Sequence, residues 1–106
     1  MTANEFRQLA LSLPNVVENA HMDHPDFRVN GKIVATLGYP DEHWAMVKLA
    51  PDDQKNFVEE SPKIFVPAKG GWGRQGSTLV RLEAANKKII KRALAAASNN
   101  ITKRRP

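Results

Sequence analysis

The sequence predicts an α+β domain in which an antiparallel sheet carries helices on one face. Short β-rich runs follow one another with turn signals between them, which is typical of hairpins. Helical apolar spacing is confined to the beginning, the middle and the end of the chain. The chain has 106 residues, 42% of them hydrophobic, which is enough for one domain with its own core. We therefore expect two layers, with five to six strands in the order α-β-β-β-β-α-β-β-α and one sheet face in water.

The first helix is predicted from about Ala3 to Leu13. Thr2 and Glu5 have the spacing of a capping box, in which each side chain accepts a hydrogen bond from the other residue's backbone. Pro14 then ends the helix. The apolar residues at helical spacing are Phe6, Leu9, Ala10 and Leu13.

A hairpin is predicted after a first strand candidate at Val16–Met22. Asn30-Gly31, between the β-rich runs 26–29 and 32–37, is a strong hairpin signal. A two-residue loop pairs Val29 with Lys32. A three-residue loop pairs Arg28 with Lys32 and gathers apolar residues on one face, and we prefer it because it separates apolar from polar side chains better. The residues that then share a face are Phe27, Ile33, Ala35 and Leu37.

The rest of the chain predicts three strands and two helices. The strands are Trp44–Leu49, Ile64–Val66 and Thr78–Leu82, and the helices run from Pro51 to Glu60 and from Glu83 to Ser98. The last helix has an apolar side and a basic side. Its apolar side holds Ile89, Ile90, Ala93, Leu94, Ala96 and Ala97, and its basic side holds Lys87, Lys88, Lys91 and Arg92. We expect the domain to span residues 1–98 and residues 99–106 to form a basic, disordered tail.

The net charge of +5 is unevenly distributed. Residues 1–60 hold 5 Lys/Arg and 10 Asp/Glu, a net −5, whereas residues 61–106 hold 11 Lys/Arg and only Glu83, a net +10. A basic half favours a polyanionic partner. The alternative is a basic helix face that is simply solvated, which has the same composition. The sequence has no cysteine, no signal-peptide pattern and no apolar run that could span a membrane. We expect a cytoplasmic monomer without membrane contact.

The segment Gly70–Gly76 holds four of the six glycines. Gly71–Gly76 fits the G-x-G-x-x-G pattern, but a strand follows it instead of a helix, which excludes a dinucleotide site. The backbone amides and Arg74 can still bind an anion. We favour a structural loop in which Trp72 packs on the edge of the sheet.

No catalytic residue, metal site or cofactor is predicted, and we expect a protein that is not an enzyme. His21, Asp23, His24 and His43 lack the spacing of a metal site. The paired carboxylates lie at turns and helix ends, where they cap helices and favour solubility. Ser77 is not a nucleophile of the elbow type, because Leu79 stands where that turn requires glycine.

Strand alternation predicts a second sheet face that points away from the helices. The residues expected on the helix side are Phe27, Ile33, Ala35, Leu37, Ala45, Val47, Leu49, Val80 and Leu82, and those on the far side are Arg28, Lys32, Thr36, Trp44, Met46, Lys48 and Arg81. Cations around an exposed tryptophan fit phosphate contact with base stacking. Cross-strand packing of Trp44 and Met46 on an ordinary solvated face is the alternative. The predicted nucleic-acid-binding residues are Arg28, Lys32, Trp44, Lys48, Lys69, Trp72, Arg74 and Arg81.

Several segments can be compared with a known family. They are Leu9–Val16, Pro25–Ile33, Val47–Leu49, Phe65–Pro67 and Trp72–Thr78 with Val80–Leu82. In this order they resemble the YjbR/MmcQ-like family of small bacterial proteins, over nearly the whole chain to about Ala97. Many relatives carry tryptophan just after the last loop glycine, where this chain has Ser77. The resemblance implies a compact α+β fold like frataxin (CyaY) and secretion chaperones, a DNA-binding role by fold-level analogy, and no established catalytic residues.

The leading hypothesis is a non-enzymatic protein that binds DNA or another nucleic acid through the basic outer sheet face and the basic C-terminal half of the chain. Low sequence specificity is expected, because no basic recognition helix with base-reading residues is present. The alternative is a protein-interaction module of chaperone-like fold. A small-anion or phosphate-ligand enzyme at the glycine-rich segment is the third and least supported hypothesis.

Overall fold

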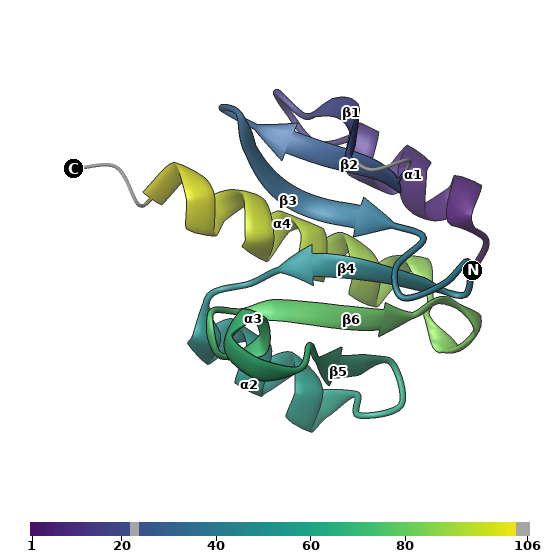
Figure 1. The fold of residues 1–106 in the computed structure, drawn as a ribbon, viewed down its shortest axis with the longest axis vertical. Coiled ribbons are helices and arrows are strands. Elements are labelled where there is room, and N and C mark those ends of the chain that lie inside the picture. The colour runs from purple at the N-terminus through teal and green to yellow at the C-terminus, as the bar shows by residue number, and fades with distance from the viewer. Residues whose placement is uncertain (22–23, 104–106) are drawn as a thin grey trace.

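The computed structural model describes residues 1–21 and 24–103 as one six-stranded antiparallel sheet with helices (Figure 1). The strands are β1 (Val17–His21), β2 (His24–Val29), β3 (Lys32–Leu37), β4 (Trp44–Lys48), β5 (Phe65–Pro67) and β6 (Ser77–Arg81). The helices are α1 (Ala3–Leu11), α2 (Pro51–Glu60), α3 (Gly70–Arg74) and α4 (Lys87–Lys103), with a 3₁₀ turn η1 (Leu82–Ala84). The strand order is β1-β2-β3-β4-β6-β5. The predicted fold class and the order of the main elements are confirmed.

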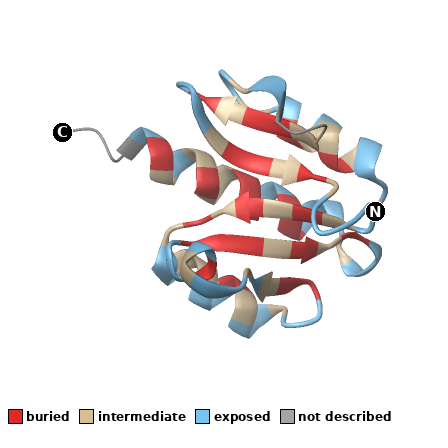
Figure 2. Cartoon of the chain, in the orientation of Figure 1, coloured by how far each residue is buried: buried red, intermediate tan, exposed pale blue. Residues whose placement is uncertain are grey.

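The core lies between the sheet and the layer formed by α1, α2 and α4 (Figure 1). Along β4, buried and partly exposed residues alternate, because successive side chains point to opposite sides of a sheet (Figure 2). The largest fully buried apolar side chains are Phe6, Phe27, Phe65, Leu49, Ile90 and Leu94. We call the sheet face toward these helices the inner face and the opposite one the outer face.

The β2–β3 hairpin differs from the preferred prediction. Val29 pairs with Lys32 across a two-residue turn, and the register shifts so that Arg28 lies opposite Ile33 while Phe27 lies opposite Ala35. The three-residue loop is therefore wrong. A bulge at Val34 supplies the extra residue, so that Val34 and Ala35 are both buried and Ile33 moves to the outer face. Asn30 and Gly31 adopt positive φ angles of 54° and 78°, as this turn requires.

Both ends of α4 differ from the prediction. The turn η1 occupies the predicted start at Glu83, and the helix begins later, where the Asn86 side chain accepts a hydrogen bond from the Ile89 backbone N–H at 3.0 Å. At its other end α4 runs to Lys103 instead of Ser98. The reason is Ile101, which is 8% exposed and continues the apolar stripe of the helix. Residues 99–103 are thus helical and not a disordered tail, while residues 104–106 lie outside the described residues.

The first helix follows its sequence signals closely. Thr2 Oγ1 accepts from the Glu5 backbone N–H at 3.1 Å, and Glu5 Oε1 accepts from the Thr2 backbone N–H at 2.8 Å, which confirms the capping box. The backbone hydrogen bond from Thr2 is the main cause of a lowered pKa of Glu5. The helix ends at Leu11, before the predicted Leu13.

Candidate functional site

The outer face carries a row of side chains that crosses all six strands. Cross-strand pairing aligns Asn19, Asp26, Thr36, Met46, Leu79 and Val66 in that order. The row is polar on β1, β2 and β3 and apolar on β4, β6 and β5. By alternation Arg28, Trp44, Lys48 and Arg81 belong to this face too. Lys32, opposite the inward-pointing Val29, does not, so its predicted place on the outer face is wrong.

Trp44 and Arg81 form the main aromatic contact of this face. They lie directly opposite each other on β4 and β6, and the Arg81 guanidinium carbon is 4.6 Å from the centre of the Trp44 ring. The Arg81 Nε also donates to the Lys63 carbonyl at 3.3 Å. The two residues are half-buried because each covers part of the other, so Trp44 is less exposed than predicted. Within the described residues Arg81 has no carboxylate partner.

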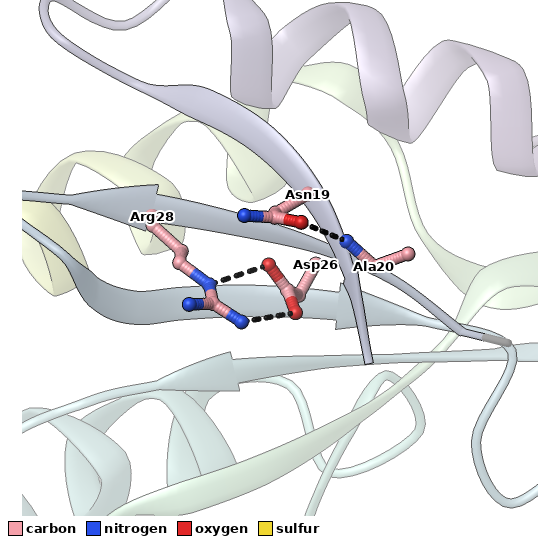
Figure 3. A network of polar contacts seen from close by, with 4 residues as sticks. All are labelled: Asn19, Ala20, Asp26 and Arg28. Carbon is pink, nitrogen blue, oxygen red and sulfur yellow. Dashed lines mark hydrogen bonds and ion pairs between the residues drawn. The ribbon is translucent and has the colours of Figure 1, made fainter. Parts of the chain in front are cut away.

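Arg28 is held in a different way (Figure 3). Its Nε and Nη2 donate to the two carboxylate oxygens of Asp26 at 2.9 and 3.1 Å, and this hydrogen bonding raises the pKa of Arg28. Asp26 is fully buried, so the charge of Arg28 is compensated within β2. Arg28 was predicted to be an available cation, and its pairing with Asp26 was not predicted. The signal was present, because residues two apart on a strand share a face.

A second ring contact, which was not predicted either, lies at the Trp44 end of the outer face. The rings of His24 and Tyr39 meet edge to face with centroids 6.4 Å apart. Between His24 and Trp44 lies Gly38, whose backbone N–H donates to the Trp44 carbonyl at 3.1 Å. A Cβ at Gly38 would come within 3.1 Å of His24 Nδ1, so the imidazole fills the space that a side chain would take. This contact depends on the pairing of β2 with β3, whose register was predicted incorrectly.

The glycine-rich segment is a short helix fixed against the end of β6. The Gln54 side-chain amide donates to the Gly73 and Ser77 carbonyls and to Thr78 Oγ1 at 3.0 to 3.1 Å. A Cβ on Gly73 would lie 1.8 Å from the Ala68 carbonyl oxygen. The close approach of α3 to the Ala68 backbone therefore requires glycine at position 73. The predicted packing of Trp72 on the sheet edge is wrong, because this side chain is 69% exposed. Lys69 and Arg74 are exposed beside it.

The YjbR family model matches residues 11–97. The chain belongs to the YjbR family. Its structure is similar to the crystal structure of the Deinococcus radiodurans protein DR2400, whose title names the family domain DUF419. The TM-score is 0.79 at 16% identity over 97% of this chain and 80% of that one, so this likeness concerns the fold. No curated protein matches the sequence. The predicted likeness to frataxin stays a prediction.

A hollow of about 520 Å³ lies at the α3 end of the YjbR-family sheet. Lys48 at the end of β4, Pro51 at the start of α2, Gln75 after α3 and Asn100 on α4 line it. The predicted site residues thus fall into separate places. Trp44 and Arg81 lie at one end of β4 and β6, Lys48, Lys69, Trp72 and Arg74 lie toward the other end, Arg28 is tied to Asp26, and Lys32 is in the hairpin turn region.

The histidines and aspartates of the segment 21–43 form no metal-ion cluster within the described part of this YjbR-family chain. Asp23 and the His21 side chain lie outside the described residues. In the part that is described, no group of three or more His, Cys, Asp or Glu side chains can hold one ion. No helix among the described residues is long and apolar enough to cross a membrane.

Proposed function

We propose that this YjbR-family domain binds nucleic acid, without catalysis, on the outer face of its sheet. The observation that carries the proposal is the Trp44–Arg81 pair, a ring and a guanidinium 4.6 Å apart on a face that α1, α2 and α4 leave uncovered. Planar side chains beside a cation take nucleotide bases by stacking and phosphates by charge.

The charge distribution supports the proposal. The cations of the outer face and of α3 include Lys48, Lys69, Arg74 and Arg81, none of which has a carboxylate within ion-pair distance among the described residues. Cations without internal partners are available to phosphates, and their contribution depends on salt concentration. Arg28, paired with Asp26, offers less than the sequence suggests.

The alternative is a protein-interaction module. One observation favours it, namely that Met46, Leu79 and Val66 form an apolar row across β4, β6 and β5 on the uncovered face. These side chains are only half-buried, and a partner's apolar surface can cover them. The two proposals predict different ligands at Trp44, namely a nucleic acid in the first and a protein surface in the second.

The test is a nucleic-acid titration of the wild type and of Trp44→Ala. If bases stack on Trp44, the alanine variant binds more weakly by about 1–3 kcal/mol, roughly 5- to 150-fold in Kd. Trp44→Phe keeps a ring and retains most of the affinity. Lys88→Ala, an exposed change on α4, is the control and leaves Kd nearly unchanged. Equal Kd values for the wild type and Trp44→Ala contradict the proposal, and the absence of any binding favours the interaction module.

A further inference from the structure

We propose that the nucleic acid bound by the outer face is single-stranded, and that its bases stack on a strip of planar side chains at one end of that face. The strip consists of Tyr39, His24 and Trp44 with Arg81. This inference rests on the proposed function and names the form of nucleic acid that the same face takes.

The geometry of the strip follows from strand pairing. His24 begins β2 and Trp44 begins β4, and Gly38, directly after β3, lies between them without a side chain. Neighbouring strands are about 4.8 Å apart, so the backbones of His24 and Trp44 lie about 10 Å from each other across the glycine. Tyr39 extends the strip by its edge-to-face contact with His24 and is 60% exposed. An uncovered sheet with several rings at one level is a surface for unstacked bases.

The charges of the strip disfavour a duplex. Duplex binding rests mainly on many phosphate contacts, and a duplex keeps the faces of its bases inside its own stack. Among the described outer-face residues, Lys48 and Arg81 are cations without a carboxylate partner, whereas Arg28 is held by Asp26. The turn before β4 adds the exposed carboxylates Asp41 and Glu42 beside the strip. The two phosphate rows of a duplex find few partners here, whereas a single strand can also stack its bases on the rings.

The basic helix α4 does not supply the missing duplex contacts. It packs on the inner face, on the far side of the sheet from the strip. Two of its cations, Lys87 and Arg92, already pair with Glu5 and Glu60. A duplex on the outer face therefore meets a flat surface without a projecting helix for its major groove.

The experiment compares a fluorescein-labelled 15-nucleotide single strand with the 15-base-pair duplex of the same sequence, by anisotropy at fixed salt. We expect the single strand to bind at least about 10-fold more tightly. Tyr39→Ala tests the strip directly, because its exposed ring can be removed without opening the core. It should weaken single-strand binding by about fivefold or more, and Tyr39→Phe should restore it, since stacking needs the ring and not the hydroxyl.

Each outcome separates this inference from the proposed function. A duplex that binds as tightly as the single strand overturns the inference and leaves nucleic-acid binding standing. Tight single-strand binding that Tyr39→Ala and His24→Ala leave unchanged places the bases elsewhere and also overturns it. If neither oligonucleotide binds, the proposed function itself fails. Melting temperatures close to that of the wild type show that the variants are folded.

Discussion

Arg92 on the helix side of the sheet and Arg81 on the outer face are held in different ways. On the helix side Arg92 donates two hydrogen bonds to Glu60 at 2.8 and 3.2 Å, and Lys87 lies 3.8 Å from Glu5. On the outer face Arg81 lies over Trp44 and has no carboxylate partner among the described residues. The most basic stretch of sequence is thus partly neutralised by acids from the first half of the chain. Charge counted along a sequence does not locate the charge that is free to bind.

The largest difference between the two sides concerns stability. Phe27 is fully buried on the inner face, and Phe27→Ala should lower the free energy of unfolding by about 3–5 kcal/mol through the cavity it leaves. Trp44→Ala should lower the free energy of unfolding by only about 1–2 kcal/mol, because removing a half-buried ring leaves no enclosed cavity. Urea denaturation of both variants measures the contrast. Equal losses mean that Trp44 belongs to the core and is not presented to a ligand.

A matched pair of arginine variants tests which cations reach phosphates. Each phosphate contact contributes roughly 0.7–0.9 to the slope of log K against log salt concentration. Arg81→Gln should reduce the magnitude of the slope by about 0.7–0.9, the contribution of one phosphate contact. Arg92→Gln should leave the slope unchanged, since Arg92 is already paired with Glu60. Titrations at several salt concentrations give both slopes. A larger reduction for Arg92→Gln would reverse the comparison and assign binding to the helix side.

The smallest expected effect is a pH dependence on the helix side. The hydrogen bonds from Arg92 lower the pKa of Glu60 below its ordinary value of 4.5. A carboxyl group with a lowered pKa stabilises the fold above pH 4.5, and this contribution disappears as the pH falls through the pKa of the folded state. Glu60→Gln should therefore be less stable than the wild type at pH 7 and approach it in stability as the pH falls through the lowered pKa of Glu60 in the folded state. Unfolding free energies across this range measure the effect, and a constant difference contradicts the assignment.

Local patterns predicted most of the fold. The capping box at Thr2 and Glu5, the Asn30-Gly31 turn and the apolar stripe of α4 each have a short-range cause, and all three are present. The β2–β3 register was wrong, because a bulge at Val34 preserves burial by a route that strict alternation does not include. The end of α4 was placed too early because one residue, Ile101, decides whether the last turn packs.

The candidate site was less predictable than the fold. Alternation alone placed Trp44 and Arg81 on one face, and they are cross-strand neighbours. The Asp26–Arg28 pair and the His24–Tyr39 contact were missed. The second depends on the register of the β2–β3 hairpin, which was predicted incorrectly. Trp72 was assigned to the sheet edge, whereas α3 makes its close approach through Gly73 and leaves the ring exposed.

The most direct test of binding on the outer face is a heteronuclear NMR titration of the whole chain with a 15-nucleotide single strand. We expect the largest shift changes at the Trp44 indole N–H and at the backbone amides of β4, β6 and the turn that includes Tyr39. The amides of Lys88 and Lys91, on the exposed side of α4, should move little. Shift changes confined to α4, with the Trp44 indole unmoved, would contradict the account.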